Sequence, residues 1–344
     1  MHSLDKLVSM KKYDASGMVA LISSFPDQCR KARDIGRSFI LPKPFKKKFD
    51  NIVCTGLGGS AIGADLVRSY VTDASGVPIF VNRGYVVPGF VNNRSLVIVT
   101  SYSGNTEETL SAYKDARRKG AAIIAITSGG SLGRSAQSDS CPVMVVSGGL
   151  PPRTAVGYSS IGLLSILEKT GVVKDQSKSI NEAIRVMDDL RDTKIGPDVP
   201  FSKNISKHIA SRLYHAYPVI YGAQDRMDAV VTRWRGQLAE NAKTLASSNL
   251  FPEMDHNEIV GWDNPAELLK KFAVVVLRDR GDHPRVARRI DITEKLIANE
   301  CGSITEVRSF GTGLLARMFS LVYIGDFTSY YLAILYKCDP TPVE

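Results

Sequence analysis

The stretch Ser95-Leu96-Val97-Ile98-Val99-Thr100 runs directly into Ser101-Tyr102-Ser103-Gly104-Asn105-Thr106, and this junction decides the fold class. The apolar run predicts a buried strand, and the loop after it combines small hydroxyl residues with one glycine. A helical pattern opens at Glu107, so the free N–H groups of its first turn point back at the loop. Such a loop suits a dianionic phosphate group, but it is also typical of an ordinary turn with a helix N-cap. The hydroxyls that would hold a phosphate are those of Ser101, Ser103 and Thr106.

Strands and helices alternate on both sides of this junction. Strands are predicted over 51–57, 77–81, 121–127 and 142–146, and helices over 61–70, 106–118, 158–169 and 180–190. Strands rich in Val and Ile that alternate with helices of ~10–15 residues are typical of a doubly wound, mostly parallel sheet. A helical segment over 14–35 precedes the first strand, because its apolar residues recur at helical spacing.

A second set follows, with strands over 218–222, 272–277 and 304–307 and helices over 229–246, 290–299 and 314–335. Residues 192–200, with two prolines and a glycine, are the predicted linker between the two sets. The fold class is therefore α/β, with two doubly wound parallel-sheet domains, a helical N-terminal segment and a helical C-terminal region. The predicted parts are 1–40 for the N-terminal segment, 41–191 and 201–335 for the two domains, and 336–344 for a C-terminal tail.

The composition of the 344 residues, 44% hydrophobic and 23% charged, is that of a globular chain. No apolar stretch reaches the ~18 residues that span a bilayer, and the N-terminus carries no signal-peptide core. We therefore expect a cytoplasmic protein with no membrane partner. The net charge of +9 includes two short basic clusters without interleaved aromatic residues, so we expect no nucleic-acid partner either. The five cysteines are scattered and include no C-x-x-C pair, which disfavours disulfides and a cysteine zinc site.

A glycine-rich turn, Gly56-Leu57-Gly58-Gly59-Ser60-Ala61, follows the first predicted strand. It fits the spacing of a dinucleotide fingerprint, which would predict a NAD(P) enzyme. The next strand ends in Asn82-Arg83-Gly84, however, and offers no acid to hold a ribose hydroxyl. The turn is therefore either a site of close helix–strand packing or a floor against which a sugar or phosphate lies. The residues of that floor would be Gly58, Gly59 and Ser60.

This glycine-rich turn and the hydroxyl loop together resemble the first sugar isomerase (SIS) domain. Three later segments and the C-terminal ending narrow the match: PPRTAVGY at 151–158, RGQLAENAK at 235–243, FPEMDHNEIVGW at 251–262 and DPTPVE at 339–344. In this order they resemble the bifunctional phosphoglucose/phosphomannose isomerases of archaea and some bacteria. The similarity runs from about Met10 to the C-terminus.

The resemblance implies reversible conversion of glucose 6-phosphate and mannose 6-phosphate into fructose 6-phosphate. Such a reaction needs a base between C1 and C2, a group that stabilises the enediolate, and an acid/base that opens the sugar ring. The resemblance assigns the base to Glu240 and ring opening to His256, which would reach the site from the other subunit of a homodimer. The candidate for stabilising the enediolate is Arg153, because a guanidinium suits the developing negative charge. Thr341 matches a family position thought to admit both C2 epimers.

The residues themselves leave alternatives open at each of these positions. Glu240 shares helical spacing with Arg233, Gln237 and Lys243, which would also fit a solvated polar face. His256 has a suitable pKa range for ring opening, but loop histidines also serve as surface or capping residues. Arg153 follows two prolines at a predicted helix start, where a plain surface cation is unfavourable.

One departure from the family pattern concerns a lysine that follows the DPTPVE motif in the family, because this sequence stops at Glu344. Either the sequence is truncated, the enzyme works without that lysine, or another residue replaces it. The five histidines form no metal-binding pair, so we predict no metal and no other cofactor. The alternative to the isomerase is a non-catalytic SIS module that senses a sugar phosphate.

Overall fold

The computed structural model describes residues 3–343, so Met1, His2 and the end of the predicted tail, Glu344, lie outside the described residues. The chain divides into two compact units. Phe25–Asn181 forms the five-stranded unit, and Met1–Ser24 together with Glu182–Glu344 forms the four-stranded unit. The division falls before the predicted linker, because residues 191–200 belong to the four-stranded unit, with Ile195 and Val199 buried.

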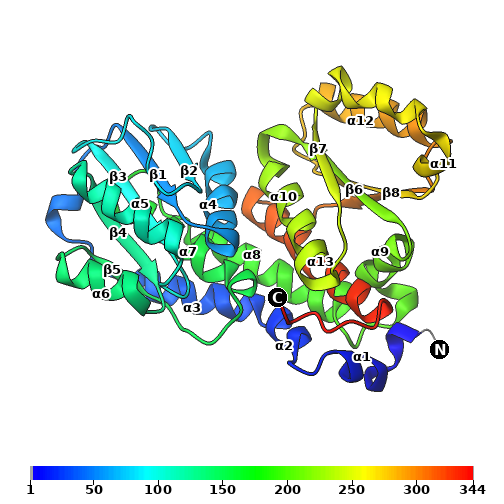
Figure 1. The fold of residues 1–344 in the computed structure, drawn as a ribbon, viewed down its shortest axis with the longest axis horizontal. Coiled ribbons are helices and arrows are strands. Elements are labelled where there is room, and N and C mark those ends of the chain that lie inside the picture. The colour runs from blue at the N-terminus through cyan, green and yellow to red at the C-terminus, as the bar shows by residue number, and fades with distance from the viewer. Residues whose placement is uncertain (1–2, 344) are drawn as a thin grey trace. The chain divides into compact units, whose positions relative to one another are not determined.

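The five-stranded unit is built on a sheet in the order β2-β1-β3-β4-β5, in which every pair of neighbours is parallel (Figure 1). Its strands are β1 (Asn51–Thr55), β2 (Ile79–Asn82), β3 (Ser95–Thr100), β4 (Ala122–Thr127) and β5 (Val143–Val145). All six residues of the central strand β3 are buried, as expected where helices cover both faces of a parallel sheet.

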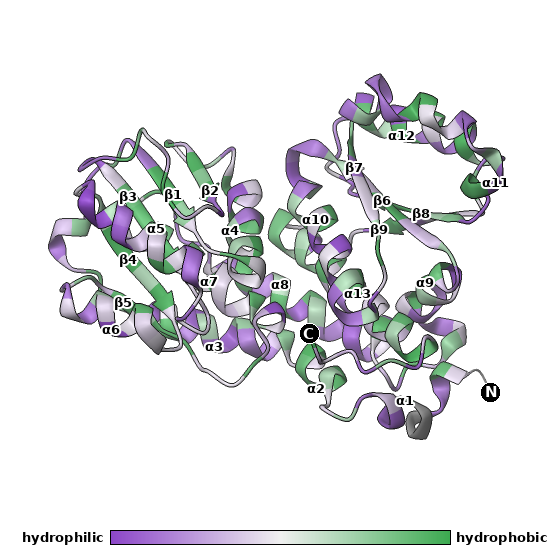
Figure 2. Cartoon of the chain, in the orientation of Figure 1, coloured by the Kyte–Doolittle hydropathy of each residue, from purple (hydrophilic) through white to green (hydrophobic). Residues whose placement is uncertain are grey.

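Two layers of helices cover this sheet. The helices of one layer are α3 (Phe25–Ser38), α4 (Gly58–Val71) and α7 (Val156–Lys169), and those of the other are α5 (Glu107–Arg118) and α6 (Gly130–Ser138). Val97 and Val99 of β3 pack in the α5 layer, whereas Ile126 of β4 lies beside Gly162 of α7. The strands are apolar along their length in Figure 2, and the outer faces of the helices carry the polar residues. α8 (Ser177–Leu190) crosses the division between the units.

The four-stranded unit has a second wholly parallel sheet, in the order β7-β6-β8-β9. Its strands are β6 (Tyr217–Ala223), β7 (Ser247–Phe251), β8 (Phe272–Arg278) and β9 (Ser303–Arg308). In both sheets the strand that comes first in the chain lies between the second and the third. The two sheets therefore share one winding order, β2-β1-β3-β4 corresponding to β7-β6-β8-β9.

The helices of the four-stranded unit also form two layers. α9 (Ile205–Leu213), α10 (Gln224–Ala242) and α13 (Leu314–Leu335) pack together, with α10 on β6. The other face carries α11 (Ala266–Leu269) and α12 (Pro284–Ile297), whose apolar residues join a core with Tyr221 and Val274. The N-terminal helices α1 (Leu7–Tyr13) and α2 (Met18–Ser23) pack against α13.

The helix α13 corrects one expectation, that no apolar stretch is long enough to span a bilayer. Its 22 residues pass that test by length and composition, but 94% of the apolar window is buried inside the structure. The helices α2, α9 and α10 pack against α13, as expected for a helix in the core of a globular protein.

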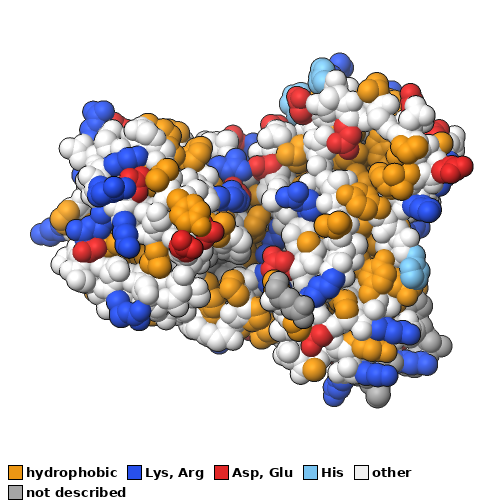
Figure 3. All heavy atoms as spheres, viewed as in Figure 1, with side chains coloured by type: hydrophobic (Ala, Val, Ile, Leu, Met, Phe, Trp, Pro, Cys, Tyr) orange, Lys and Arg blue, Asp and Glu red, His pale blue; other side chains and the backbone are white. Residues whose placement is uncertain are grey.

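The predicted α/β class with two parallel sheets is confirmed. The strand β7 was not predicted, because Ser247-Ser248-Asn249 gives it a polar sequence and it lies half-buried at a sheet edge. On the face shown in Figure 3, the basic side chains are scattered among acidic and apolar ones over both units and form no continuous stripe.

Candidate functional site

The carboxyl ends of β1 and β3 are the candidate binding position in the five-stranded unit. β1 and β3 are neighbours, yet the chain leaves β1 toward β2 and leaves β3 toward β4, so the loops after them diverge. In open parallel sheets ligands bind at such a reversal of strand order, beyond the carboxyl ends of the strands. The structure brings two predicted segments to this one point: the glycine-rich turn after β1 and the hydroxyl loop after β3.

One hydrogen bond joins these two loops directly. The backbone N–H of Tyr102 donates to the hydroxyl oxygen of Ser60 at 3.3 Å, and both side chains are buried. Ser60 therefore fixes the glycine-rich turn to the hydroxyl loop, a connecting role that the sequence does not reveal.

The hydroxyl loop is folded around Ser101, whose side chain is buried. The hydroxyls of Ser101 and Thr106 lie 3.0 Å apart, and the N–H of Gly104 donates to Ser101 Oγ at 3.1 Å. Gly104 has φ +72°, and a Cβ there would collide with the carbonyl oxygen of Gly129, so only glycine fits the turn. Ser103 is exposed at the tip of the loop. The loop thus presents three serine and threonine hydroxyls within six residues of chain, one of them buried and two more accessible.

The helix α5 begins directly after this loop. Thr106 is its N-cap residue, but the Thr106 side chain makes no capping hydrogen bond and contacts Ser101 instead. The first N–H groups of an α-helix have no partner within the helix, and they carry the positive end of its dipole. The start of α5 and the hydroxyl loop together form an environment suited to an anion.

Arg153 lies in a 3₁₀ turn, Pro152–Thr154, just before α7, and its backbone is next to Gly59 of the glycine-rich turn. Its side chain is only 5% exposed, which excludes the alternative of a plain surface arginine. A Cβ on Gly59 would collide with the carbonyl oxygen of Pro152, so the turn and the start of α4 are in close contact. The hydroxyl of Ser159 strengthens this contact by donating to the carbonyl of Gly59 at 3.1 Å.

Tyr102 is a residue of this region that the sequence analysis missed. Its hydroxyl donates to the carbonyl of Ser147 at 2.8 Å and accepts from the N–H of Leu150 at 3.1 Å. Burial raises the pKa of this phenol above its usual value, with the Leu150 hydrogen bond acting in the opposite direction. Tyr102 thereby ties the hydroxyl loop to the segment that leads into Arg153. Its position inside a loop of small residues was the only available signal.

Glu240 lies in the last turn of α10, in the four-stranded unit, and is half-buried. The residues that share its helical spacing do not form one solvated face. Arg233 is buried and pairs with Asp326 of α13 through Nη2 and Oδ2 at 2.8 Å, and Gln237 is buried as well. Burial raises the pKa of Asp326, and Arg233 acts to lower it. The polar contacts between α10 and α13 therefore fix the helix that carries Glu240.

The C-terminal tail lies beside Glu240 within the same unit. A cavity of about 550 Å³ is lined by Glu240 and neighbouring residues of the α10 end together with Pro342 and Val343. The backbone N–H of Thr341 donates to Asp339 Oδ1 at 2.8 Å, which orders the tail next to this cavity. The structure thus brings Glu240 and the Thr341 segment together.

His256 lies elsewhere in the four-stranded unit, in the 3₁₀ turn Glu253–His256 that follows β7. Its neighbours anchor the turn: Met254 is buried, and Asp255 accepts from the hydroxyl of Thr293 at 3.0 Å. The imidazole itself is exposed. His256 is therefore held on a fixed turn with its side chain at the surface of the unit.

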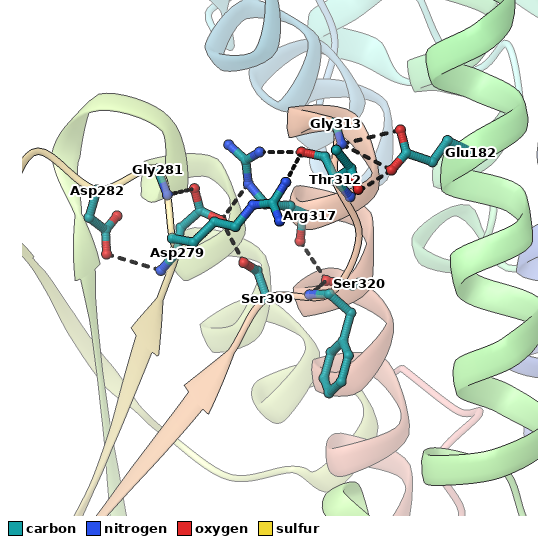
Figure 4. Close-up of polar contacts among 11 residues, drawn as sticks. Glu182, Asp279, Gly281, Asp282, Ser309, Thr312, Gly313, Arg317 and Ser320 are labelled. Atoms are coloured by element: carbon teal, nitrogen blue, oxygen red, sulfur yellow. Dashed lines mark hydrogen bonds and ion pairs between the residues drawn. The ribbon is translucent and has the colours of Figure 1, made fainter.

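The corresponding edge of the second sheet carries different chemistry (Figure 4). The loop after β8 opens with Asp279, whose carboxylate accepts from Arg317 Nε at 2.8 Å, Ser309 Oγ at 2.5 Å and the N–H of Gly281 at 2.9 Å. Glu182 of α8 accepts from the N–H groups of Thr312 and Gly313 just before α13. Carboxylates already satisfied by arginine and backbone donors leave this edge poorly suited to a phosphate.

Within residues 3–343, no three His, Cys, Asp or Glu side chains come together as a metal site requires. The absence of a metal requirement stays a prediction.

Two domain families match the chain. The family described as the SIS domain matches residues 46–141, and the one described as the bacterial phospho-glucose isomerase C-terminal SIS domain matches residues 202–344. These matches fall on the two parallel sheets.

Full-length relatives are also similar. A bifunctional phosphoglucose/phosphomannose isomerase of Caldicellulosiruptor bescii is 46% identical over 327 residues, or 95% of this chain and 96% of the relative. One from Aquifex aeolicus is 36% identical and covers 86% of this chain and 88% of its own. A solved structure described as a glucose-6-phosphate isomerase like protein from Thermus thermophilus has a TM-score of 0.64 at 18% identity, covering 100% of this chain and 99% of that chain, which supports the fold. On the strength of these identities and coverages, the chain belongs to the family of bifunctional phosphoglucose/phosphomannose isomerases, built from two SIS domains.

Proposed function

We propose that this protein interconverts glucose 6-phosphate and mannose 6-phosphate with fructose 6-phosphate, as an aldose–ketose isomerase. The main support is the hydroxyl loop Ser101–Thr106 at the switch point of the first sheet, together with the buried residue Arg153, whose backbone lies against Gly59 of the neighbouring glycine-rich turn. A tethered phosphate and a cation at one crevice are what an enediolate reaction on a sugar phosphate needs. The names of the full-length relatives support the same substrates.

The phosphate is assigned to the hydroxyls of Ser101, Ser103 and Thr106 and the first N–H groups of α5. Gly58, Gly59 and Ser60 form the floor, where the lack of side-chain bulk permits close approach of the ligand. Ser60 Oγ accepts from the N–H of Tyr102, and its O–H can still donate to a phosphate oxygen. The assignment is supported by the hydrogen bonds that join the two loops.

The proton transfer is assigned to Glu240. Its carboxylate takes the proton from C2 of the ring-opened aldose and returns it to C1, while the hydroxyl proton on O2 passes to O1, so that no proton is gained or lost overall. Arg153 balances the negative charge that develops on the enediolate oxygen. His256 opens the ring by exchanging a proton with the ring oxygen and the C1 hydroxyl. The support for Arg153 is its burial next to Gly59, and the support for Glu240 is the cavity that it lines.

We further propose that the protein works in the cytoplasm as a homodimer, in which each chain supplies His256 to the site of its partner. The exposed imidazole on an anchored turn supports this arrangement. Mixing Glu240→Gln and His256→Ala subunits tests it, because a mixed dimer has one intact site. If His256 is shared, two inactive proteins regain up to about a quarter of wild-type activity on subunit exchange. A lack of recovery, with mixed dimers demonstrated by mass spectrometry, would contradict the shared site.

The function itself is tested by offering glucose 6-phosphate and mannose 6-phosphate separately and measuring fructose 6-phosphate by an independent enzyme assay. The isomerase turns over both aldoses. A non-catalytic sensor would bind the sugar phosphates in calorimetry without forming any ketose, and that result would replace the isomerase by the sensing module.

A further inference from the structure

The end of α10 has an unusual backbone. Lys243 is its C-cap residue and adopts a left-handed conformation with φ 54° and ψ 33°. Left-handed conformations are disfavoured for residues with a Cβ, and helix ends normally place glycine there. The contacts of the Lys243 side chain therefore need an explanation at this position, where a glycine would be expected.

The ammonium of Lys243 meets three backbone carbonyls. It lies 2.7 Å from the oxygen of Glu240, 2.7 Å from that of Pro342 and 3.4 Å from that of Pro340. An ammonium has three N–H donors and no acceptor, so it can donate to carbonyls of both segments at once. Lys243 therefore joins the last turn of α10, at the residue Glu240 itself, to two points of the C-terminal tail.

The sequence of the C-terminal tail restricts its backbone where Lys243 contacts it. Two prolines fix φ at alternate positions, so their carbonyls are presented with little conformational freedom. Asp339 Oδ1 accepts from the N–H of Thr341, which sets the chain direction between the prolines. Thr341 thus lies between the two residues whose carbonyls Lys243 holds.

We propose that Lys243 is a positioning residue that holds the tail around Thr341 beside the cavity lined by Glu240 and Pro342, and so sets the balance between the two C2 epimers as substrates. This inference rests on the proposed isomerase function and on the assignment of Thr341 to the C1–C2 region. If Lys243 no longer holds the tail, the cavity wall contacts the C2 hydroxyl of the substrate differently. The C2 hydroxyl differs in configuration between glucose 6-phosphate and mannose 6-phosphate. Lys243 also lines this cavity, and its ammonium acts on the tail by holding the carbonyls of Pro340 and Pro342.

The test compares kcat/KM for mannose 6-phosphate with kcat/KM for glucose 6-phosphate in four variants: Lys243→Met, Lys243→Arg, Thr341→Ala and Lys295→Met. Lys243→Met keeps the apolar stem of the side chain and removes the donors, and Lys243→Arg keeps donors and charge. Lys295 is a matched control, an exposed lysine in the last turn of α12. Thermal unfolding of each variant is measured beside the kinetics.

Lys243→Met is expected to change the epimer ratio by about threefold or more, in the same direction as Thr341→Ala. Lys243→Arg should restore most of the ratio, and Lys295→Met should leave it unchanged. A loss of stability alone would lower the amount of active enzyme for both substrates equally and could not move the ratio. An unchanged ratio in Lys243→Met overturns the proposal, whether or not Thr341→Ala moves it. Failure of the isomerase assignment would look different, because the wild-type protein would then convert neither epimer.

Discussion

The hydroxyl oxygens of Ser101 and Thr106 lie 3.0 Å apart, across a turn that is closed by the N–H of Gly104. This contact takes the hydroxyl of Thr106 away from its ordinary capping position at the start of α5. A hydroxyl pair fixed in this way at the switch point of a parallel sheet is ready to donate to an anion without further ordering.

Replacing Ser101 by Ala, or Thr106 by Val, should raise KM for each sugar phosphate by about tenfold to a hundredfold. Hydrogen bonds to charged groups contribute about 1.5–3 kcal/mol, and each 1.4 kcal/mol is a factor of ten in binding. Steady-state kinetics on both aldose phosphates measures this effect. Ser138→Ala, at an exposed position at the end of α6, is the matched control. A KM within a factor of two of wild type in both site variants would show that this loop does not bind the phosphate.

Gly59→Ala should disturb the candidate site and the fold together. The added Cβ would collide with the carbonyl oxygen of Pro152, and that backbone atom cannot move without shifting Arg153. Overpacking of this kind typically lowers the free energy of unfolding by about 1–3 kcal/mol. Urea denaturation gives the stability and the coupled assay gives kcat. Gly76→Ala adds a Cβ to open space and should change neither quantity. Wild-type values for Gly59→Ala would show that Arg153 does not depend on this contact.

Asp282 should make the stability of the protein depend on pH. Burial raises the pKa of its carboxyl to about 6, while the Asp279 N–H acts in the opposite direction. The folded state therefore holds this proton more tightly than the unfolded state, and the wild type loses stability as the pH rises from about 4 to 6. The free energy of unfolding of Asp282→Asn, minus that of wild type, should increase across this window in urea titrations. Asp263→Asn, at an exposed position, is the control. A difference that is constant with pH would contradict the raised pKa.

Removal of divalent metal should leave the isomerase active. Glu240, His256 and Arg153 supply a base, an acid and a cation from the chain itself, so the proposed scheme needs no metal to polarise the substrate. Activity is measured before and after prolonged dialysis against EDTA, with the metal content checked by elemental analysis. Loss of activity that zinc restores would contradict the metal-free scheme.

Much of the fold could be predicted because its signals are local. The run Ser95–Thr100 is apolar throughout and lies in the centre of the first sheet, where burial on both faces requires such a sequence. The strand β7 escaped prediction because an edge strand with one half-buried side needs no apolar alternation. The long helix α13 is apolar nearly all round, and only its packing shows that other helices of the chain cover it.

The sequence predicts the individual segments of the candidate site, but it does not predict the contacts between them. Helical spacing alone grouped Arg233 and Gln237 with Glu240, but it could not show that α13 brings Asp326 against the first of them. Ser60 could be placed near a ligand from the sequence, whereas its bond to Tyr102 depends on the neighbouring positions of β1 and β3. The contact between Lys243 and the tail joins segments about a hundred residues apart, and no local pattern announces it.

The most direct test of the proposed mechanism is the turnover of Glu240→Gln, measured with glucose 6-phosphate as substrate. Glutamine keeps the size and the hydrogen-bonding capacity of the side chain but cannot accept the proton from C2. If Glu240 is the base, kcat falls by about 10²–10⁴ with little change in KM, while Glu267→Gln at an exposed position keeps wild-type kinetics. A Glu240→Gln protein that retains more than about half of the wild-type kcat, well outside that range, would contradict the assignment of proton transfer to this carboxylate.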